Sequence, residues 1–243
     1  MSSSRFCSSL YLLTFAFLLR TVFGADPLFH FCSSSEKFEA GSPYEENLNK
    51  FMGYLYCQAP PTGFGRGVLG DKPNQTIGLA LCRGDVLTVD CNTCVVDAST
   101  EIRKRCPYNR AAVIFYDNCL LKYSDKDFFG EIDNENKFYL YNAEKVRNPT
   151  TFNKKTKELL SQLAIQAQSS LKLFAVGQLK VKNSQTIYGL TQCTREMPAE
   201  VCRRCLDGII GELPSCCDAQ KGGRVISGSC NFRYELYQFV HLR

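Results

Sequence analysis

Two stretches of the chain place apolar side chains at helical spacing. The first is PYEENLNKFMGYL and the second is TFNKKTKELLSQLAIQA. Apolar residues three or four positions apart predict a helix that packs one face on a core. Pro43 suits the first turn of the first helix. The expected buried positions are Tyr44, Leu48, Phe51, Met52 and Leu55 in the first helix, and Phe152, Leu159, Leu160, Leu163 and Ile165 in the second.

A further helix is predicted from about Asp90, a good N-cap residue, through the stretch CNTCVVDASTEIRKRC. Its apolar residues also recur on one face, which should pack on the same core. A fourth helix of the same kind should begin near Pro198. The expected buried positions of the helix near Asp90 are Cys91, Cys94, Val95, Ala98 and Ile102.

Between these helices lie runs that are rich in β-branched and aromatic residues, which favour strands. The runs are FGRGVL, TIGLALC and AAVIFYDNCLLKYS in the first half, and LFAVGQLKV, TIYGLTQC and RVISGSCNFRYELYQF in the second. Strands and helices that do not alternate strictly favour an antiparallel sheet with helices on one face. The expected fold class is therefore α+β.

The chain contains an internal repeat with an offset of 111 residues. Five cysteines share this offset, and so do several glycines and apolar residues, which indicates a tandem duplication. Each copy has about 105 residues, the size of a small domain. We expect a first domain at residues 27–133, a linker at 134–137 within the polar stretch SDKDFFGEIDNENK, and a second domain at 138–243. The cysteines are Cys82, Cys91, Cys94, Cys106 and Cys119, which recur as Cys193, Cys202, Cys205, Cys217 and Cys230.

The N-terminus predicts a secretory signal peptide at residues 1–24. Arg5 precedes an apolar run of about ten residues, which is too short to span a bilayer, and small or apolar residues follow at Val22 and Gly24. Cleavage after Gly24 would start a mature, extracellular chain at Ala25, without a membrane span. Loss of Arg5 and Arg20 lowers the formal net charge from +5 to +3, which is too small to favour nucleic acid as a partner.

An exported chain meets an oxidising compartment, where regularly spaced cysteines are typical of disulfides. Helical positions three apart lie side by side, so Cys91 and Cys94 should both point toward the strands that carry Cys82 and Cys119. The second copy should have the equivalent bonds. The expected pairs are Cys82–Cys91, Cys94–Cys119, Cys193–Cys202 and Cys205–Cys230.

A redox pair or a metal site fits this pattern less well. A redox Cys-x-x-Cys needs thiols without other partners, whereas each cysteine here has a candidate in its own domain. Zinc sites with four thiolates are typical of intracellular proteins, and the two histidines, His30 and His241, lie at opposite ends of the mature chain. We therefore expect no metal and no cofactor. Asn74 begins the sequon NQT and is a candidate for N-glycosylation.

The spacing C-x8-C-x2-C occurs twice, and two longer stretches accompany it: GSPYEENLN at residues 41–49 and CLDGIIGELPSCCDAQKGGRVISGSCNFRYELYQF at residues 205–239. Together they resemble the plant cysteine-rich repeat secretory proteins, which consist of two ginkbilobin-homologous domains. The resemblance covers nearly the whole mature chain. It implies two helices on a five-stranded antiparallel sheet in each domain, and a secreted, apoplastic protein.

The resemblance also implies a sugar site in the second domain. Ginkbilobin, a single-domain antifungal relative, binds mannose through an Asn, an Arg and a Glu. The equivalent Arg and Glu are Arg224 and Glu235, on either side of Cys230. The Asn follows the first cysteine of the domain, which this second copy lacks, and Asn142 is the candidate.

The first domain should lack this sugar site. It has Val113 and Ser124 at the positions of the Arg and the Glu, and Ser33 after its first cysteine. An Arg donor and a Glu acceptor suit the vicinal hydroxyls of a sugar. Arg224 and Glu235 could instead form a cross-strand ion pair on a solvated sheet face, so both interpretations stay open.

Three cysteines fall outside the predicted pairs. The resemblance implies a bond between Cys32 and Cys106, which leaves Cys57, Cys216 and Cys217. A bond between the adjacent Cys216 and Cys217 needs a strained ring. We expect at least one unpaired thiol in the monomer, and Cys57, just past the first helix, should be the accessible one.

Two functions fit the sequence. One is a mannose-type carbohydrate-binding protein with an antifungal or defence role, and the other is an interaction module that binds extracellular proteins without a sugar. An enzyme is not expected, because the common hydrolase, metalloprotease and phosphate-loop motifs are absent from the sequence. The tripeptide Arg83-Gly84-Asp85 resembles an adhesion motif, but it adjoins a framework cysteine and is expected to be ordinary loop structure.

Overall fold

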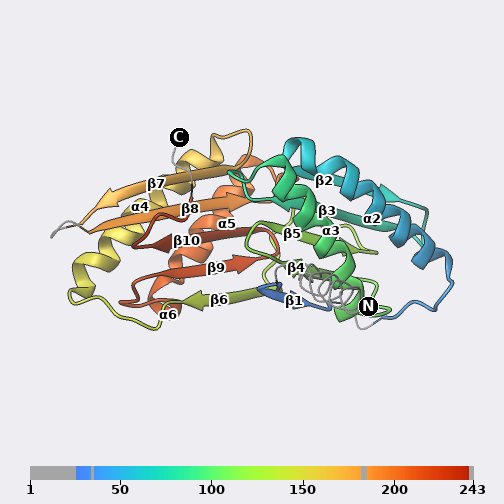
Figure 1. Ribbon diagram of the computed structural model, residues 1–243, viewed down its shortest axis with the longest axis horizontal. Helices are drawn as coiled ribbons and strands as arrows, with labels where there is room; N and C mark the ends of the chain where they lie inside the picture. The colour runs from blue at the N-terminus through green and yellow to red at the C-terminus, as the bar shows by residue number, and fades with distance from the viewer. Residues whose placement is uncertain (1–25, 34–35, 182–184, 241–243) are drawn as a thin grey trace, which may run out of the picture.

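The structure is a computed structural model that describes residues 26–33, 36–181 and 185–240 (Figure 1). The predicted signal peptide lies outside these residues. Two five-stranded antiparallel sheets lie side by side along the long axis, with strand orders β1-β4-β5-β3-β2 and β6-β9-β10-β8-β7. The first consists of β1 (Phe29–Phe31), β2 (Phe64–Leu69), β3 (Thr76–Cys82), β4 (Ala112–Phe115) and β5 (Cys119–Ser124). The second consists of β6 (Lys137–Tyr141), β7 (Phe174–Lys180), β8 (Thr186–Cys193), β9 (Gly223–Ser227) and β10 (Cys230–Glu235).

Helices cover one face of each sheet. The first sheet carries α2 (Pro43–Thr62) and α3 (Thr88–Arg105), and the second carries α4 (Pro149–Gln168), α5 (Ala199–Gly211) and the short α6 (Leu213–Cys216). The apolar faces of these helices and every second residue of the central strands form one buried core per domain. The predicted α+β fold, with two main helices on a five-stranded antiparallel sheet in each domain, is confirmed.

The repeat extends to the helices at a slightly different offset. The buried residues of α2 and α4 match at an offset of 108, so Tyr44 is equivalent to Phe152 and Leu48 to Thr156. From the third strand of each sheet onward the offset is 111. Residues of the helices and strands of one domain therefore have identifiable counterparts in the other, and the change of offset reflects insertions between these elements.

Several sequence predictions need correction. Helix α3 begins at Thr88, and Asp90 lies in its first turn instead of at the N-cap. Ile165 is exposed, because it lies between Ala164, which is in the core, and the solvent side of α4. Cys57 lies inside α2, whose last turn continues through two prolines, and it is exposed. The edge strands β1 and β6 were not predicted, because neither forms a separate hydrophobic run in the sequence.

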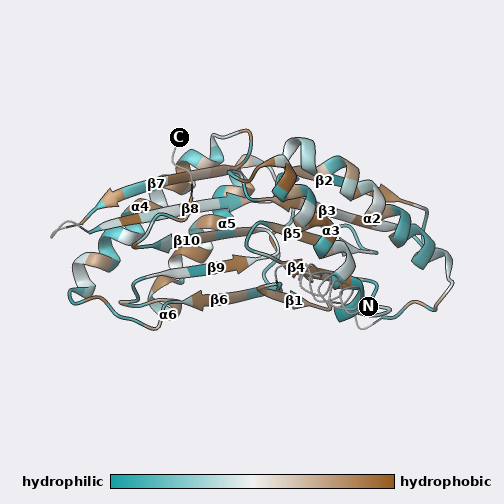
Figure 2. Ribbon diagram, in the orientation of Figure 1, coloured by the Kyte–Doolittle hydropathy of each residue, from teal (hydrophilic) through white to brown (hydrophobic). Residues whose placement is uncertain are grey.

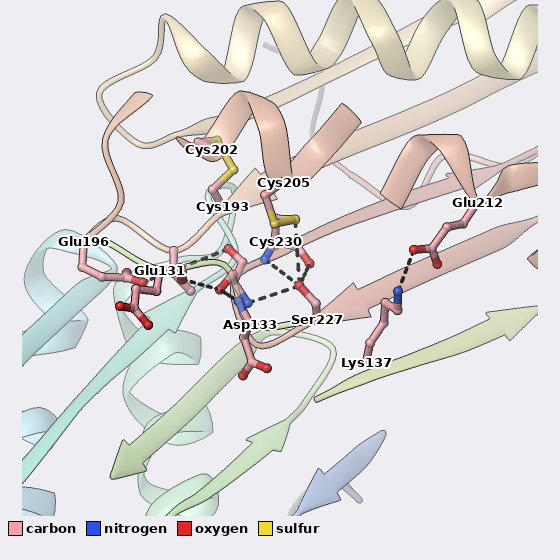
Figure 3. Close-up of a disulfide and its surroundings, with 12 residues drawn as sticks. Glu131, Asp133, Lys137, Cys193, Glu196, Cys202, Cys205, Glu212, Ser227 and Cys230 are labelled. Carbon is pink, nitrogen blue, oxygen red and sulfur yellow. Dashed lines mark hydrogen bonds and ion pairs between the residues drawn. A yellow bond between two sulfur atoms is a disulfide. The ribbon is translucent and has the colours of Figure 1, made fainter. Parts of the chain in front are cut away.

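The structure contains six disulfides among its described residues. Five coincide with the expected pairs, and four of these join a helix to the sheet beneath it. Figure 3 shows Cys193–Cys202 and Cys205–Cys230 together below α5. Bonds of this kind each stabilise a small domain by about 2–4 kcal/mol. The five pairs are Cys32–Cys106, Cys82–Cys91, Cys94–Cys119, Cys193–Cys202 and Cys205–Cys230.

The sixth disulfide joins the adjacent Cys216 and Cys217. Cys217 occupies the position that is equivalent to Cys106, and the second domain has no cysteine at the position equivalent to Cys32, the partner of Cys106. The adjacent cysteine therefore takes the place of the missing partner. Cys57 is left as the free thiol among the described residues.

The two domains meet through the faces of their sheets that carry no helices. Val113 and Phe115 of the first sheet pack with Phe138 and Ile226 of the second. Figure 2 shows hydrophobic residues on β6 and β9, next to the first sheet. Hydrogen bonds across the junction join the Gln192 amide to the Cys82 carbonyl (3.0 Å) and the Arg195 guanidinium to the Thr62 carbonyl (2.9 Å).

Candidate functional site

A hollow of about 290 Å³ lies beyond the end of β6, over the helix-free face of β9 and β10. Residues alternate between the two faces of a strand, so Arg224 projects to this face while Val225 lies in the helix-covered core. Glu235 projects to the same face from β10. The lining includes Asn142, Arg224 and Glu235, so the structure brings the three predicted sugar-binding residues together at one hollow.

Arg224 is held by an acid of the other domain. Its Nη1 lies 2.7 Å from Oδ1 of Asp117, which is at the tip of the β4–β5 hairpin of the first domain. Only 11% of the Arg224 side chain is exposed, and its Nε has no hydrogen-bond partner among the described residues. Burial lowers the pKa of Arg224 to about 10, with Asp117 acting in the opposite direction. The side chain is thus charged at neutral pH, and its buried Nε donor is not satisfied within the protein.

Asp117 binds three arginines. Its carboxylate contacts Arg224, Arg233 and Arg83, at 2.7, 3.3 and 3.4 Å. Partial burial would raise the pKa of Asp117, but the three positive charges outweigh it and hold the pKa below its usual value. The ionised carboxylate therefore links the two domains at one wall of the hollow.

Glu235 is oriented by Arg233. Nε of Arg233 donates to Oε1 of Glu235 at 3.0 Å, and the guanidinium also lies over the ring of Phe239, 4.3 Å from its centroid. Oε2 of Glu235 lies against Gly222, where a Cβ would be only 1.9 Å away. The glycine therefore makes room for this carboxylate. The first domain has Ala111 and Ser124 at these two positions.

A backbone hydrogen bond shows which residue of the first domain is equivalent to Asn142. Its N–H donates to the Gly222 carbonyl at 2.9 Å, as the N–H of Ser33 donates to the equivalent Ala111 carbonyl at 2.9 Å. Asn142 is therefore the counterpart of Ser33, the residue after Cys32, and Tyr141 occupies the position of the missing cysteine. The Asn142 side-chain oxygen accepts from the N–H of Glu144, and its exposed amide NH₂ group has no partner among the described residues.

Aromatic side chains frame the hollow. The side chains of Tyr141 and Tyr237 are 60% and 54% exposed, and both line it together with Leu28 and Leu140. Exposed tyrosines combine an apolar ring with a polar hydroxyl, and they commonly contribute contact area at binding sites. The site thus combines charged hydrogen-bonding groups with an aromatic rim.

The equivalent hollow of the first domain has different chemistry. It has a volume of about 370 Å³, is lined by Ser33 and Ser124, and contains Lys122 in place of Arg233. Lys122 pairs with Asp133 at 2.7 Å and lies over Phe128, 4.4 Å from its ring centroid. Val113, the counterpart of Arg224, packs in the domain junction. The Arg and Glu that characterise the second hollow are therefore missing from the first.

The direct ion pair between Arg224 and Glu235, considered from the sequence, is not formed. The cross-strand neighbour of Arg224 is Arg233; both arginines contact Asp117, and Glu235 pairs with Arg233. Sequence reasoning missed Asp117 and Arg233. Arg233 could have been found, because both domains carry a cation at this position and an aromatic residue six positions later, whereas Asp117 enters the site only through the packing of the two domains.

The other candidates from the sequence have structural contacts. Arg83 and Asp85 pair with each other at 2.6 Å, so the adhesion-like tripeptide is a closed loop. Asn74 lies half-buried in the turn between β2 and β3, and its glycosylation stays a prediction. His30, Cys32 and Cys106 lie close together, but both sulfurs form a disulfide and are not available as thiolate ligands. Within the described residues, no helix is long and apolar enough to cross a membrane.

Comparison with known proteins agrees with this two-domain architecture. A family model described as salt stress response/antifungal matches residues 31–126 and 140–237. An antimicrobial ginkbilobin-2-like protein of Castanea crenata is 52% identical over 240 residues, which cover 99% of this chain and 99% of the relative. Cysteine-rich repeat secretory protein 38 of Arabidopsis thaliana is 51% identical over 216 residues, which cover 88% of this chain and 85% of the relative.

The fold is also that of a solved tandem structure. The crystal structure of the tandem DUF26 ectodomain of the Arabidopsis thaliana cysteine-rich receptor-like protein PDLP8 matches with a TM-score of 0.77 at 25% identity, over 86% of this chain and 97% of the ectodomain. The fold and its cysteine framework thus define a tandem DUF26 protein. The chain belongs to the salt stress response/antifungal family, whose domain it carries twice. Like its relatives, it is a secreted, extracellular protein.

Proposed function

We propose that the protein is a carbohydrate-binding defence protein whose second domain binds mannose-type sugars at the hollow of Asn142, Arg224 and Glu235. The observation that carries the proposal is that these three residues, just after β6, on β9 and on β10, line one hollow. A role in defence is supported by the antimicrobial relative and by the description of the family.

The chemistry of the hollow supports a neutral sugar with vicinal hydroxyls. The Arg224 guanidinium and the Asn142 amide can donate, and the Glu235 carboxylate can accept. Charge-assisted hydrogen bonds of both polarities are the contacts that hold a polyol in a shallow site. Tyr141 and Tyr237 supply apolar surface for the sugar ring.

The same geometry supports binding in place of catalysis. A glycosidase needs a carboxylic acid that stays protonated near neutral pH, which requires a raised pKa. Arginines hold the pKa of Asp117 below its usual value, and Glu235 is paired with Arg233. Asp117 is therefore not arranged to donate a proton to a leaving group.

Calorimetric titration of the mature protein with methyl α-mannoside and methyl α-galactoside tests the proposal. Asn142→Ala is the most informative variant, because Asn142 is exposed and its loss should not disturb the fold. We expect about tenfold weaker mannoside binding, since one hydrogen bond to a charged or polar ligand contributes about 1–1.5 kcal/mol. Ser33→Ala, the same change at the equivalent position of the first domain, is the matched control and should leave affinity unchanged.

Arg224→Lys and Glu235→Gln extend the test to the charged pair. Lys keeps the charge beside Asp117 but lacks the planar guanidinium with its several donors, and Gln keeps the shape of Glu235 but weakens its acceptor. Both should weaken mannoside binding. If the wild-type protein binds neither mannoside nor a mannose-containing glycan array and instead recovers an extracellular protein partner, the sugar proposal is wrong and the interaction-module function is favoured.

A further inference from the structure

A second hollow lies on the opposite, helix-covered side of the same sheet. It has a volume of about 320 Å³ and opens between the first turns of α4 and the short helix α6. Its inner wall consists of Thr156, Leu213, Pro214, Cys217 and Tyr234. Volumes of about 300 Å³ and above, with mostly apolar walls and few polar groups, are typical of small-molecule sites.

One polar group in this wall has no partner. The side chain of Thr156 is only 2% exposed, and its hydroxyl makes no hydrogen bond among the described residues. A buried hydroxyl without a partner opposes folding unless another molecule satisfies it. Thr156 therefore indicates that the occupant carries a hydrogen-bonding group at its inner end.

In the first domain, different side chains lie at the positions equivalent to this hollow. Leu48 replaces Thr156, and Arg103 replaces Pro214. The Arg103 guanidinium pairs with Glu45 at 3.0 Å and lies over the ring of Phe38, 5.5 Å from its centroid. In the second domain Asn153 takes the place of Glu45, and the cation is missing. The hollow of the second domain therefore lies where the first domain has this arginine–glutamate ion pair, which acts as a plug.

The rim of the hollow is positively charged. Lys154 and Lys157 are exposed, line the opening, and pair with no carboxylate among the described residues. The lining also contains one carboxylate, Asp218, which accepts a hydrogen bond from the Asn153 amide at 2.7 Å, so the two lysines leave a net positive charge. The outer end of the hollow therefore favours a negative charge.

We infer that this hollow binds a small aromatic acid that carries a hydroxyl group remote from its carboxylate. The ring packs on Leu213, Pro214 and the disulfide sulfur of Cys217. The ring hydroxyl reaches Thr156, and the carboxylate faces Lys154 and Lys157. An engineered apolar cavity of about 150 Å³ accepts benzene, so a volume of about 320 Å³ has room for a single substituted ring.

Titration with 4-hydroxybenzoate, followed by saturation-transfer NMR and calorimetry, tests the inference. We expect one site per chain with a Kd below about 1 mM, a range that suits a ligand of about ten non-hydrogen atoms. Benzoate, which lacks the hydroxyl, and 4-hydroxybenzamide, which lacks the charge, should each bind several-fold more weakly. A 4-hydroxybenzoate titration that does not approach saturation at millimolar concentration overturns the inference.

Substitutions in the hollow test the contact with Thr156 and the location of the site separately. Thr156→Val keeps the shape of the side chain, so it should weaken 4-hydroxybenzoate several-fold and leave benzoate unchanged. The double variant Asn153→Glu/Pro214→Arg installs the plug of the first domain and should abolish binding of both acids. If this variant folds, as judged by its melting temperature, and still binds 4-hydroxybenzoate with wild-type affinity, the site is wrongly placed.

Further variants test the contribution of the lysine charges and show whether the ligand binds at this hollow or at the sugar hollow. Lys154→Gln/Lys157→Gln should weaken 4-hydroxybenzoate but not 4-hydroxybenzamide, whereas Lys126→Gln, at an exposed position of the first domain, should affect neither. Equal affinity of the acid and the amide for the wild-type protein would show that the ligand is not an acid. Asn142→Ala should leave 4-hydroxybenzoate binding intact, because the sugar hollow lies across the sheet, so the two proposals can fail independently.

Discussion

The carboxylate of Asp133 occupies the space that a side chain on Gly228 would take, because a Cβ added to Gly228 would lie 2.2 Å from Oδ2 of Asp133. Gly228 is the repeat counterpart of Asp117, at the tip of the hairpin between β9 and β10. Asp117 contacts Arg233, and Asp133 contacts Lys122, the counterpart of Arg233. The same contact between an acid and a cation is thus made twice, and in the second case the segment between the domains supplies the acid.

These contacts predict acid sensitivity. Burial opposes ionisation of Asp133, but the charge of Lys122 and hydrogen bonds from Lys122 and Asn136 outweigh it and lower its pKa. A carboxylate with a lowered pKa stabilises the folded state above its ordinary value of about 4, and this contribution is lost as the pH falls through the folded-state pKa. We expect the free energy of unfolding, measured in guanidinium chloride, to fall below about pH 4.

Asp133→Asn identifies the group responsible. It should cost roughly 2–3 kcal/mol at pH 7, because it leaves the largely buried Lys122 ammonium without its counter-ion. It should also flatten the pH dependence between about pH 5 and 2. Asp71→Asn, at an exposed turn, is the matched control. Equal pH dependence in the wild-type protein and Asp133→Asn would contradict this role.

Gly222→Ala should reduce sugar binding without unfolding the protein. The new methyl group would meet the flexible end of Glu235, which can move, so the carboxylate is displaced from its place beside Arg233. We expect mannoside affinity to fall by about tenfold, the loss of one charge-assisted hydrogen bond. Ala111→Gly, the reverse change at the equivalent position of the first domain, should leave affinity unchanged. A wild-type titration curve for Gly222→Ala would exclude Glu235 from the site.

Glu196→Gln should stabilise the protein at neutral pH. Burial raises the pKa of Glu196, a hydrogen bond from Thr194 offsets this in part, and Oε2 has no partner among the described residues. A carboxyl with a raised pKa stabilises best while protonated, and its contribution is lost as the pH rises through the folded-state pKa. We expect a gain of about 1 kcal/mol at pH 7 and none at pH 3. Glu200→Gln, on the exposed first turn of α5, should show no such gain.

Alkylation without prior reduction should label one cysteine of the mature chain, Cys57. The other cysteines of the described residues form disulfides, whereas Cys57 is exposed on α2. Peptide mapping by mass spectrometry locates the label, and Cys57→Ser should remove it without changing the melting temperature. Labelling at Cys216 or Cys217 would show that the vicinal disulfide does not form.

Most of the fold could be predicted from local patterns in the sequence. Amphipathic spacing located α2 and α4, and the cysteine repeat located α3, α5 and the strands below them. The three-residue strand β1 was missed, because it is defined only by its pairing with β4. Ile165 was assigned to the core because an apolar residue one position beyond a helical stripe cannot be distinguished from one inside it by spacing alone.

The site was less accessible to sequence reasoning. Arg224 and Glu235 came from a resemblance, and the structure pairs each with a residue that the resemblance did not include. Asp117 reaches Arg224 across 107 positions of sequence, and the contact depends on how the two domains pack. Such contacts have no local sequence pattern, and the same holds for the unsatisfied hydroxyl of Thr156.

The dependence of Arg224 on Asp117 bears on how the protein can be divided. A truncated chain containing only the second domain would expose Arg224 opposite Arg233 with no carboxylate between them, and like charges paired across strands are destabilising. The excised half would present a more cationic surface that attracts polyanions in a way the intact molecule does not. Binding data from the isolated second half would therefore not represent the intact protein. Binding experiments need the chain with both domains.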